Sequence, residues 1–147
     1  MYKHILVPTD GSKLSQHAAQ HALAIAKATG ARVTGLFVAP APTPLVFKGL
    51  MPVRHVQPDE HAVLIAKAAK RYLGDIQAAA AAAAVAYEGV TVEGEFPAEA
   101  ILKTAARRRC DLIVMASHGR RGLSGILLGS ETQKVLTQAK VPVLVCR

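Results

Sequence analysis

The residues best suited to bind an anion lie in one stretch, MASHGRRGLSGILLGS, from Met115 to Ser130. It holds four glycines, two adjacent arginines and one histidine within sixteen residues. Glycine lets the backbone take a positive φ and approach an oxyanion closely. Arginine donates charge-assisted hydrogen bonds to phosphate oxygens. These residues alone leave two interpretations open: a phosphate-binding loop or a glycine-rich surface turn with solvated arginines.

The common nucleotide signatures are absent from this stretch. The glycines of GRRGLSG follow a GxxGxxG pattern, whereas the dinucleotide fingerprint is GxGxxG. The chain also lacks the GxxxxGK[ST] pattern of Walker-type loops. The spacing therefore disfavours NAD binding and excludes an ordinary Walker loop.

The end of the stretch carries a signal for the start of a helix. Ser130 and Gln133 fit the S-x-x-Q capping box, which predicts Ser130 as the capping residue. The free N–H groups of a first helical turn and the positive end of the helix dipole attract anions. We therefore expect the loop and this helix start to form one anion site.

A second polar motif, PTDGS, follows the apolar run His4 to Pro8. Asp10 is its charged residue. An aspartate in this position can also cap the following helix or close a turn.

The elements that must position these motifs alternate in type. Short apolar runs predict strands, and apolar residues at helical spacing predict helices between them. The expected strands cover 4–8, 32–40, 90–96, 111–117 and 141–147, and the expected helices cover 14–29, 65–84, 97–108 and 130–139. The second helix includes the alanine run from Ala78 to Ala84, because alanine is the best helix former.

Strands that alternate with helices form a parallel sheet with right-handed crossovers and helices on both faces. We predict an α/β fold of one domain, a Rossmann-like open five-stranded parallel sheet with strand order 3-2-1-4-5. The first and fourth strands are the most apolar and belong in the middle. Pro142 favours an edge position for the last strand. Ligands bind such sheets beyond the carboxyl ends of the strands where the order reverses, and both motifs emerge there.

The connection from about residue 39 to 60 contains five prolines and shows no clear period. It is longer than most connections in a compact domain, so we interpret it as functional or mobile.

Composition and charge exclude several classes of protein. The net charge of +8 suits an anionic ligand, but aromatic residues make up only 4% and tryptophan is absent, which disfavours stacking on nucleic acid. No apolar run is long enough to cross a membrane, so we expect a cytoplasmic protein without a membrane partner. Cys110 and Cys146 lack metal-ligand spacing and are expected to be small buried hydrophobic residues.

Other candidate residues have simpler interpretations. His17 and His21, and His55 and His61, lack the further ligands that zinc requires, so we expect surface histidines. The arginines 107–109 are expected to complement the dipole at the end of the third helix. His118 has no carboxylate at a spacing that would orient it as a base.

The segments ILVPTDGS, GLFVAP, GEFPAEAILKTAA, DLIVMASHGRRGLSGILLGS and VPVLVCR together resemble the universal stress protein family over residues 1–147. The nucleotide-binding branch of that family carries G-x-x-G, nine residues, then G-[ST]. Here Ala116 stands at the first glycine, Gly119 at the second, and Gly129 with Ser130 completes the pattern. The resemblance implies one universal stress protein domain related to the adenine nucleotide alpha hydrolase-like folds.

The resemblance also implies a site for ATP, ADP or AMP, with Mg²⁺ held mainly on phosphate oxygens and no direct protein ligand for the metal. Adenine would lie at the ends of the first two strands and the ribose hydroxyls at a carboxylate, while the phosphates follow the glycine-rich loop. The implied nucleotide-binding residues are Pro8, Thr9, Asp10, Val38, Ala116, Ser117, His118, Gly119, Arg120, Arg121, Gly122, Gly129, Ser130, Glu131 and Thr132.

The function expected from the resemblance is regulation in the stress response by an ATP- or AMP-binding homodimer that pairs through residues 142–147. The methyl group of Ala116 keeps a nucleotide-free interaction module open as an alternative. A slow ATP hydrolase is the third alternative, but phosphoryl transfer needs a positioned water, and the sequence offers no clear group for that role. The expectation is a protein without enzymatic activity or with weak ATP hydrolysis at most.

Overall fold

A computed structural model describes residues 1–41, 46–48, 51–54, 57–120 and 128–147. Five parallel strands form its sheet in the order β5-β2-β1-β6-β7. Their bounds are β1 His4–Pro8, β2 Arg32–Ala39, β5 Tyr87–Glu93, β6 Leu112–Ala116 and β7 Val143–Cys146. Numbered along the chain, these strands have the order 3-2-1-4-5, so the predicted fold class and topology are confirmed.

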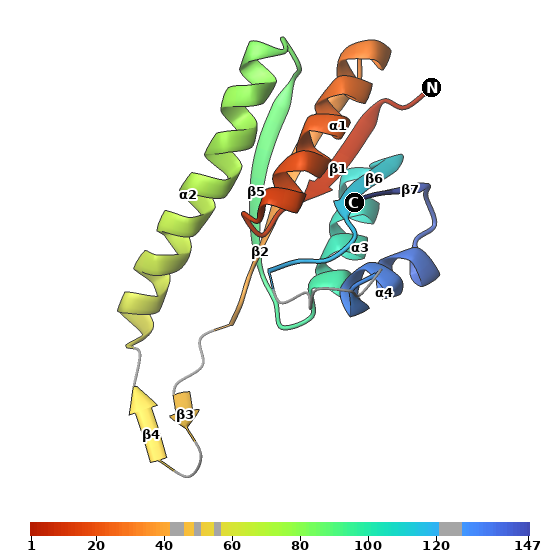
Figure 1. Ribbon diagram of the computed structural model, residues 1–147. Coiled ribbons are helices and arrows are strands. Elements are labelled where there is room, and N and C mark those ends of the chain that lie inside the picture. Colours follow the sequence, from red (N-terminus) through yellow and green to blue (C-terminus); the bar gives the residue numbers. More distant parts are fainter. Residues whose placement is uncertain (42–45, 49–50, 55–56, 121–127) are drawn as a thin grey trace.

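Within these described residues, four helices cover the two faces of the sheet (Figure 1). Their bounds are α1 Lys13–Thr29, α2 Pro58–Ala82, α3 Pro97–Arg108 and α4 Ser130–Gln138. One apolar core joins α1 and α2 to the sheet through residues such as Ala22 and Ile76. A second core joins α3 and α4 to the opposite face through Ile101 and Val135. The alternation of strand and helix places each crossover helix over the sheet, which is why both faces are buried.

The two central strands are apolar because both of their faces are covered. All five residues of β6 are buried, as are the first four of β1. Pro142 precedes the edge strand β7, where it disrupts no central hydrogen-bonding ladder. The predictions for the middle and for this edge of the sheet are confirmed.

The third strand of the sheet differs from its predicted range. It covers Tyr87–Glu93 instead of 90–96, and its register runs from Val33 opposite Tyr87 to Ala39 opposite Glu93. The prediction followed the β-branched residues toward Pro97, but pairing with β2 ends at Glu93, and the next residues lead into α3.

The proline-rich connection contains secondary structure that the sequence did not indicate. Strands β3 (Val46–Lys48) and β4 (Met51–Arg54) pair antiparallel as a separate two-stranded sheet. Segments of three and four residues are too short to show a period, so their pairing depends on each other and not on a local pattern.

The start of α4 also differs from its predicted cap. Gly129 is the capping residue and provides no side chain, whereas Ser130 is the first helical residue. Gln133 donates its side-chain amide to the carbonyl of Leu128 (3.2 Å) instead of completing a capping box. The capping-box prediction was therefore wrong by one residue, although the helix begins where it was expected.

Candidate functional site

Two loops meet at the carboxyl ends of β1 and β6, where the strand order reverses. Figure 1 shows the segment after β6 running toward the start of α1. The contact between the loops is a hydrogen bond from the backbone N–H of Arg120 to Oδ2 of Asp10, over 2.7 Å. The two polar motifs that lie 110 residues apart in the sequence thus share one crevice.

Asp10 accepts hydrogen bonds from both sides of this crevice. Its Oδ1 accepts the backbone N–H of Ser12 (3.0 Å), which closes the turn before α1, while Oδ2 accepts from Arg120. Burial alone would raise the pKa of this carboxyl, but hydrogen bonds from Ser12 and Arg120 outweigh burial and lower the pKa below its usual value. The carboxylate is therefore ionised at neutral pH and retains lone pairs for further donors.

Gly119 is required for this contact because of the space around Asp10. A Cβ atom at position 119 would lie 2.7 Å from Oδ2 of Asp10, closer than carbon and oxygen can approach. The absence of a side chain lets the loop backbone reach the carboxylate.

The turn after β1 is held from beneath by buried hydroxyl groups. The N–H of Thr9 donates to the carbonyl of Leu36 (2.8 Å), and its hydroxyl contacts that of Ser15 at 3.1 Å. Gly11 donates its N–H to the same Thr9 hydroxyl (3.2 Å), and Ser12 caps α1 by accepting from the N–H of Ser15 (3.1 Å). This network makes Thr9 a structural support for the position of Asp10.

Tyr72 on α2 is a residue at this site that the sequence analysis did not assign to it. Its ring lies against Gly11, where an added Cβ would be only 2.2 Å from the ring, and Gly11 has φ +75°. The Tyr72 ring also makes an edge contact with Phe37 (centroids 5.5 Å apart) and lies 5.0 Å beneath the guanidinium carbon of Arg120. A tyrosine at helical spacing among alanines is typical of a core residue. No signal in the sequence therefore indicated that Tyr72 lies at this site.

The start of α4 is fixed to the end of β6. Gly129 donates its N–H to the carbonyl of Ser117 (2.7 Å), and Thr132 donates its hydroxyl to the carbonyl of Ala116 (3.1 Å). A Cβ at Gly129 would lie 3.3 Å from the Cα of His118, so the two segments pack backbone to backbone. Among the predicted residues, these five are brought together on the α4 side of the crevice.

The remaining predicted site residues lie in different settings. Pro8 and Val38 are half-buried at the ends of β1 and β2, and Ser130 is exposed at the first turn of α4. Glu131 turns to α3, where it accepts the N–H of Ala98 (2.8 Å) and pairs with Lys134 (2.8 Å).

Burial would raise the pKa of Glu131, but Lys134 and the N–H of Ala98 lower it overall. Its carboxylate therefore serves as a cap for α3 in this structure. Arg121 and Gly122 lie outside the described residues.

The histidines that the structure describes form no cluster suited to catalysis or metal binding. Nδ1 of His118 contacts the hydroxyl of Ser117 at 3.2 Å, and no carboxylate contacts His118 among the described residues. His17 and His21 pack ring to edge at 4.6 Å, and His61 contacts the carbonyl of Pro40. His55 lies outside the described residues. Within the described ranges, no group of three or more potential ligands could hold a metal ion.

Both cysteines are free and buried, as predicted. Burial raises the pKa of the Cys110 thiol to about 11, so it is protonated at neutral pH.

The arginines 107 and 108 occupy the last turn of α3, as expected for cations at that end of the dipole, and Arg109 ends the helix. In the part of the chain that the structure describes, no helix has the length and apolar character needed to span a membrane.

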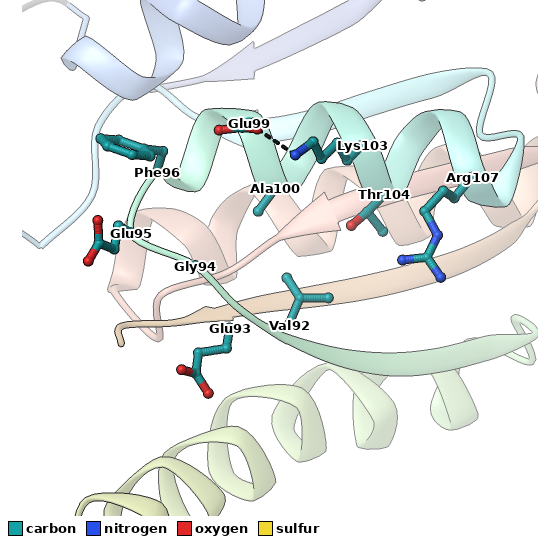
Figure 2. A pocket seen from close by; sticks show the side chains of 10 residues that line it. All are labelled: Val92, Glu93, Gly94, Glu95, Phe96, Glu99, Ala100, Lys103, Thr104 and Arg107. Carbon is teal, nitrogen blue, oxygen red and sulfur yellow. Dashed lines mark ion pairs between the residues drawn. The ribbon is translucent and has the colours of Figure 1, made fainter. Parts of the chain in front are cut away.

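A groove of about 250 Å³ lies elsewhere, between the end of β5 and α3. Figure 2 shows Val92, Ala100 and Thr104 pointing into the space between these elements, while Phe96 points away from it. Glu99 and Lys103 pair across one turn of α3 at 2.5 Å. None of the predicted nucleotide-binding residues lines this groove, which is therefore separate from the crevice.

Several known proteins that resemble this chain match it over its whole length. The family model described as the universal stress protein family matches residues 1–147. A universal stress protein of Methanocaldococcus jannaschii is 35% identical over 152 residues, covering 100% of this chain and 83% of the relative.

Solved structures show the same relationship. The universal stress protein UspA from Lactobacillus plantarum has a TM-score of 0.79 at 27% identity and covers 99% of this chain and 98% of its own. A universal stress protein in complex with cAMP has a TM-score of 0.73 at 27% identity, with 99% and 97% coverage. On the sequence match over its full length and on this shared fold, the chain belongs to the universal stress protein family.

Proposed function

We propose that this protein binds an adenine nucleotide, ATP, ADP or AMP, in the crevice between β1 and β6 and acts as a regulatory homodimer. The observation that carries the proposal is the 2.7 Å contact between Asp10 and the N–H of Arg120, which brings an ionised carboxylate to the glycine-rich loop. A family relative whose structure is in complex with cAMP supports an adenine nucleotide as the ligand class.

The two ends of the crevice suit the two ends of a nucleotide. The carboxylate of Asp10 has lone pairs for ribose hydroxyl donors, and the neighbouring Pro8, Thr9 and Val38 would line the base. An uncharged base and hydroxyl groups are compatible with this end, whereas a phosphate beside Asp10 would be repelled.

The phosphates belong at the α4 end of the crevice. The first intrahelical bond runs from the N–H of Gln133 to the carbonyl of Gly129 (3.0 Å), so the N–H groups of Ser130, Glu131 and Thr132 have no partner within the helix. These donors and the positive end of the helix dipole stabilise anions. The hydroxyl of Thr132 is bound to Ala116, so Thr132 contributes through its backbone.

A bound Mg²⁺ would be held by the phosphate oxygens. The described residues contain no cluster of protein ligands for a metal, and Mg²⁺ commonly binds through substrate phosphates with several waters. The protein's contribution is then the orientation of the phosphates along Ser117, His118 and Gly119 and at the start of α4.

Isothermal titration with ATP and Mg²⁺, together with a thermal shift assay, tests this proposal. Saturating nucleotide raises the melting temperature of a binder by mass action. Mass spectrometry of ligand that co-purifies identifies the preferred nucleotide. If titration gives no heat, the melting temperature does not shift and no nucleotide co-purifies, the nucleotide-free interaction module is supported instead. The observation that favours this alternative is the methyl group of Ala116 at the end of β6.

Weak ATP hydrolysis is the remaining alternative. His118 contacts Ser117 but no carboxylate among the described residues, so no oriented base is present there. ATP recovered intact after hours with stoichiometric protein would exclude hydrolysis as the function.

The proposed dimer pairs through residues 142–147. Strand β7 is an edge strand of the sheet without a charged side chain, and Leu144 retains 39% of its surface exposed. The opposite edge, β5, carries Glu88 and Glu93, charges of the kind that prevent edge pairing. We further propose that the dimer acts in the cytoplasm during stress, in keeping with its family.

A further inference from the structure

We infer that Tyr72 is a positioning residue that holds Arg120 over the nucleoside end of the crevice, so that both residues close the site around ribose and base. This inference rests on the proposed adenine nucleotide function. It assigns a role to a residue of α2, an element outside the glycine-rich loop and the turn after β1.

The ring of Tyr72 is itself fixed in place from two directions. Phe37, which is buried in β2, meets the ring at an interplanar angle of 84°, and the backbone of Gly11 approaches the ring too closely to admit a Cβ atom. A ring held by a strand and a turn is a rigid surface on which a flexible side chain can rest.

Arg120 rests on that surface. Its guanidinium carbon lies 5.0 Å from the ring centroid, within the range of a cation–π interaction. The same residue donates its backbone N–H to Asp10. The side chain of Arg120 is therefore held by α2 and its backbone by the turn after β1, which together restrain Arg120 itself.

The location of this contact distinguishes it from a phosphate contact. Tyr72 lies on α2, which packs with α1 on one face of the sheet, whereas α4 packs on the opposite face. The guanidinium lies over the Tyr72 ring, which itself contacts Gly11, and so it is on the α1 and α2 side of the crevice and not on the α4 side. An arginine that binds phosphate would raise the affinity for ATP more than the affinity for adenosine. An arginine at the nucleoside end raises both affinities equally.

Titration calorimetry with adenosine, AMP and ATP on four proteins tests this role. The proteins are the wild type, Tyr72→Leu, Arg120→Met and the double variant. A cation–π contact at an exposed site corresponds to an affinity change of about two- to fivefold. We expect Tyr72→Leu to weaken all three ligands by this same factor, and to have no added effect when Arg120→Met is already present.

Two controls separate positioning from other effects. Tyr72→Phe keeps the aromatic ring and is expected to bind all three ligands as the wild type does. Arg107→Gln removes one positive charge from α3, far from the crevice, and is expected to leave all three affinities unchanged. Thermal melts of each variant report any loss of folding separately.

The possible outcomes are distinct. Equal weakening of the three ligands, its disappearance in the Arg120→Met background and rescue by Tyr72→Phe support the inference. Weakening that grows with the number of phosphates, additive effects in the double variant, or unchanged binding by Tyr72→Leu overturns it while the proposed function stands. A wild type that binds none of the three ligands overturns both.

Discussion

The backbone N–H of Arg120 donates to Oδ2 of Asp10 over 2.7 Å and joins the loop after β6 to the turn after β1. A carboxylate that accepts two N–H groups is held in one orientation, and its lowered pKa reflects that stabilisation. Because the proposed nucleotide site includes this contact, changes near it should affect both folding and ligand binding.

Replacement of Asp10 by asparagine is expected to weaken adenine nucleotide binding and to lower the free energy of unfolding by about 1–3 kcal/mol. The amide has one acceptor oxygen, so it cannot accept from Ser12 and Arg120 as the carboxylate does. Calorimetry and urea denaturation measure the two effects. Asp75→Asn, an exposed substitution on α2, is the matched control. Wild-type affinity in Asp10→Asn would contradict the assignment of the ribose to this carboxylate.

Addition of a methyl group at Gly119 is expected to lower stability by about 1–3 kcal/mol and to weaken binding, because Cβ would overlap Oδ2 of Asp10. Gly74→Ala provides the contrast, since a Cβ there meets no atom within 4 Å inside a helix. That variant should gain about 0.5–1 kcal/mol from the higher helix propensity of alanine. Denaturation curves for both proteins test the pair, and equal effects would show that the close approach at Gly119 is unimportant.

Acid should weaken the fold through His4. Burial lowers the pKa of this histidine, with Arg32 acting in the same direction, and its ring contacts the carbonyl of Arg108 (3.0 Å) and the hydroxyl of Thr34 (2.8 Å). Because the folded-state pKa lies below the unfolded value of 6.5, the unfolded chain takes up the proton first. Stability from this group is therefore complete above about pH 6.5 and is lost as pH falls toward the folded-state pKa.

Denaturant titrations between about pH 7.5 and pH 5.5 measure that loss, since the lowered carboxyl pKa values affect stability at more acidic pH. His4→Gln, which cannot titrate, should flatten the dependence in this window. The same slope in both proteins would assign the effect to other groups.

Introduction of a charge on β7 should separate the proposed dimer. Leu144→Lys places an ammonium group on the uncharged edge, where pairing with a second copy would bury it against a like charge. Sedimentation velocity at micromolar concentration should show a dimer for the wild type and a monomer for this variant. Thr91→Lys on the opposite edge strand β5 is the control and should remain dimeric. A monomeric wild type would exclude the dimer.

The sequence pattern was sufficient to predict the elements that are marked by an apolar run, by helical spacing or by a local backbone preference. The buried runs of β1 and β6, the helical spacing before Gly30 and Pro97 at the start of α3 each depend on local burial or backbone preference. The alternation of these elements then determined the parallel sheet, its order and the crevice at its reversal point. The pairing of β3 with β4 and the register that ends β5 at Glu93 depend on partner strands, which no local pattern encodes.

The sequence by itself determined the polar groups at the crevice: Asp10 after the first strand, the glycines after the fourth and a helix start near Ser130. Only the tertiary structure decided what each contacts. It joined Asp10 to Arg120, turned Glu131 toward Ala98 and placed Tyr72 of α2 under the guanidinium. The physical reason is that residue type and spacing limit which hydrogen bonds a group can make, whereas the packing of distant elements selects its partner.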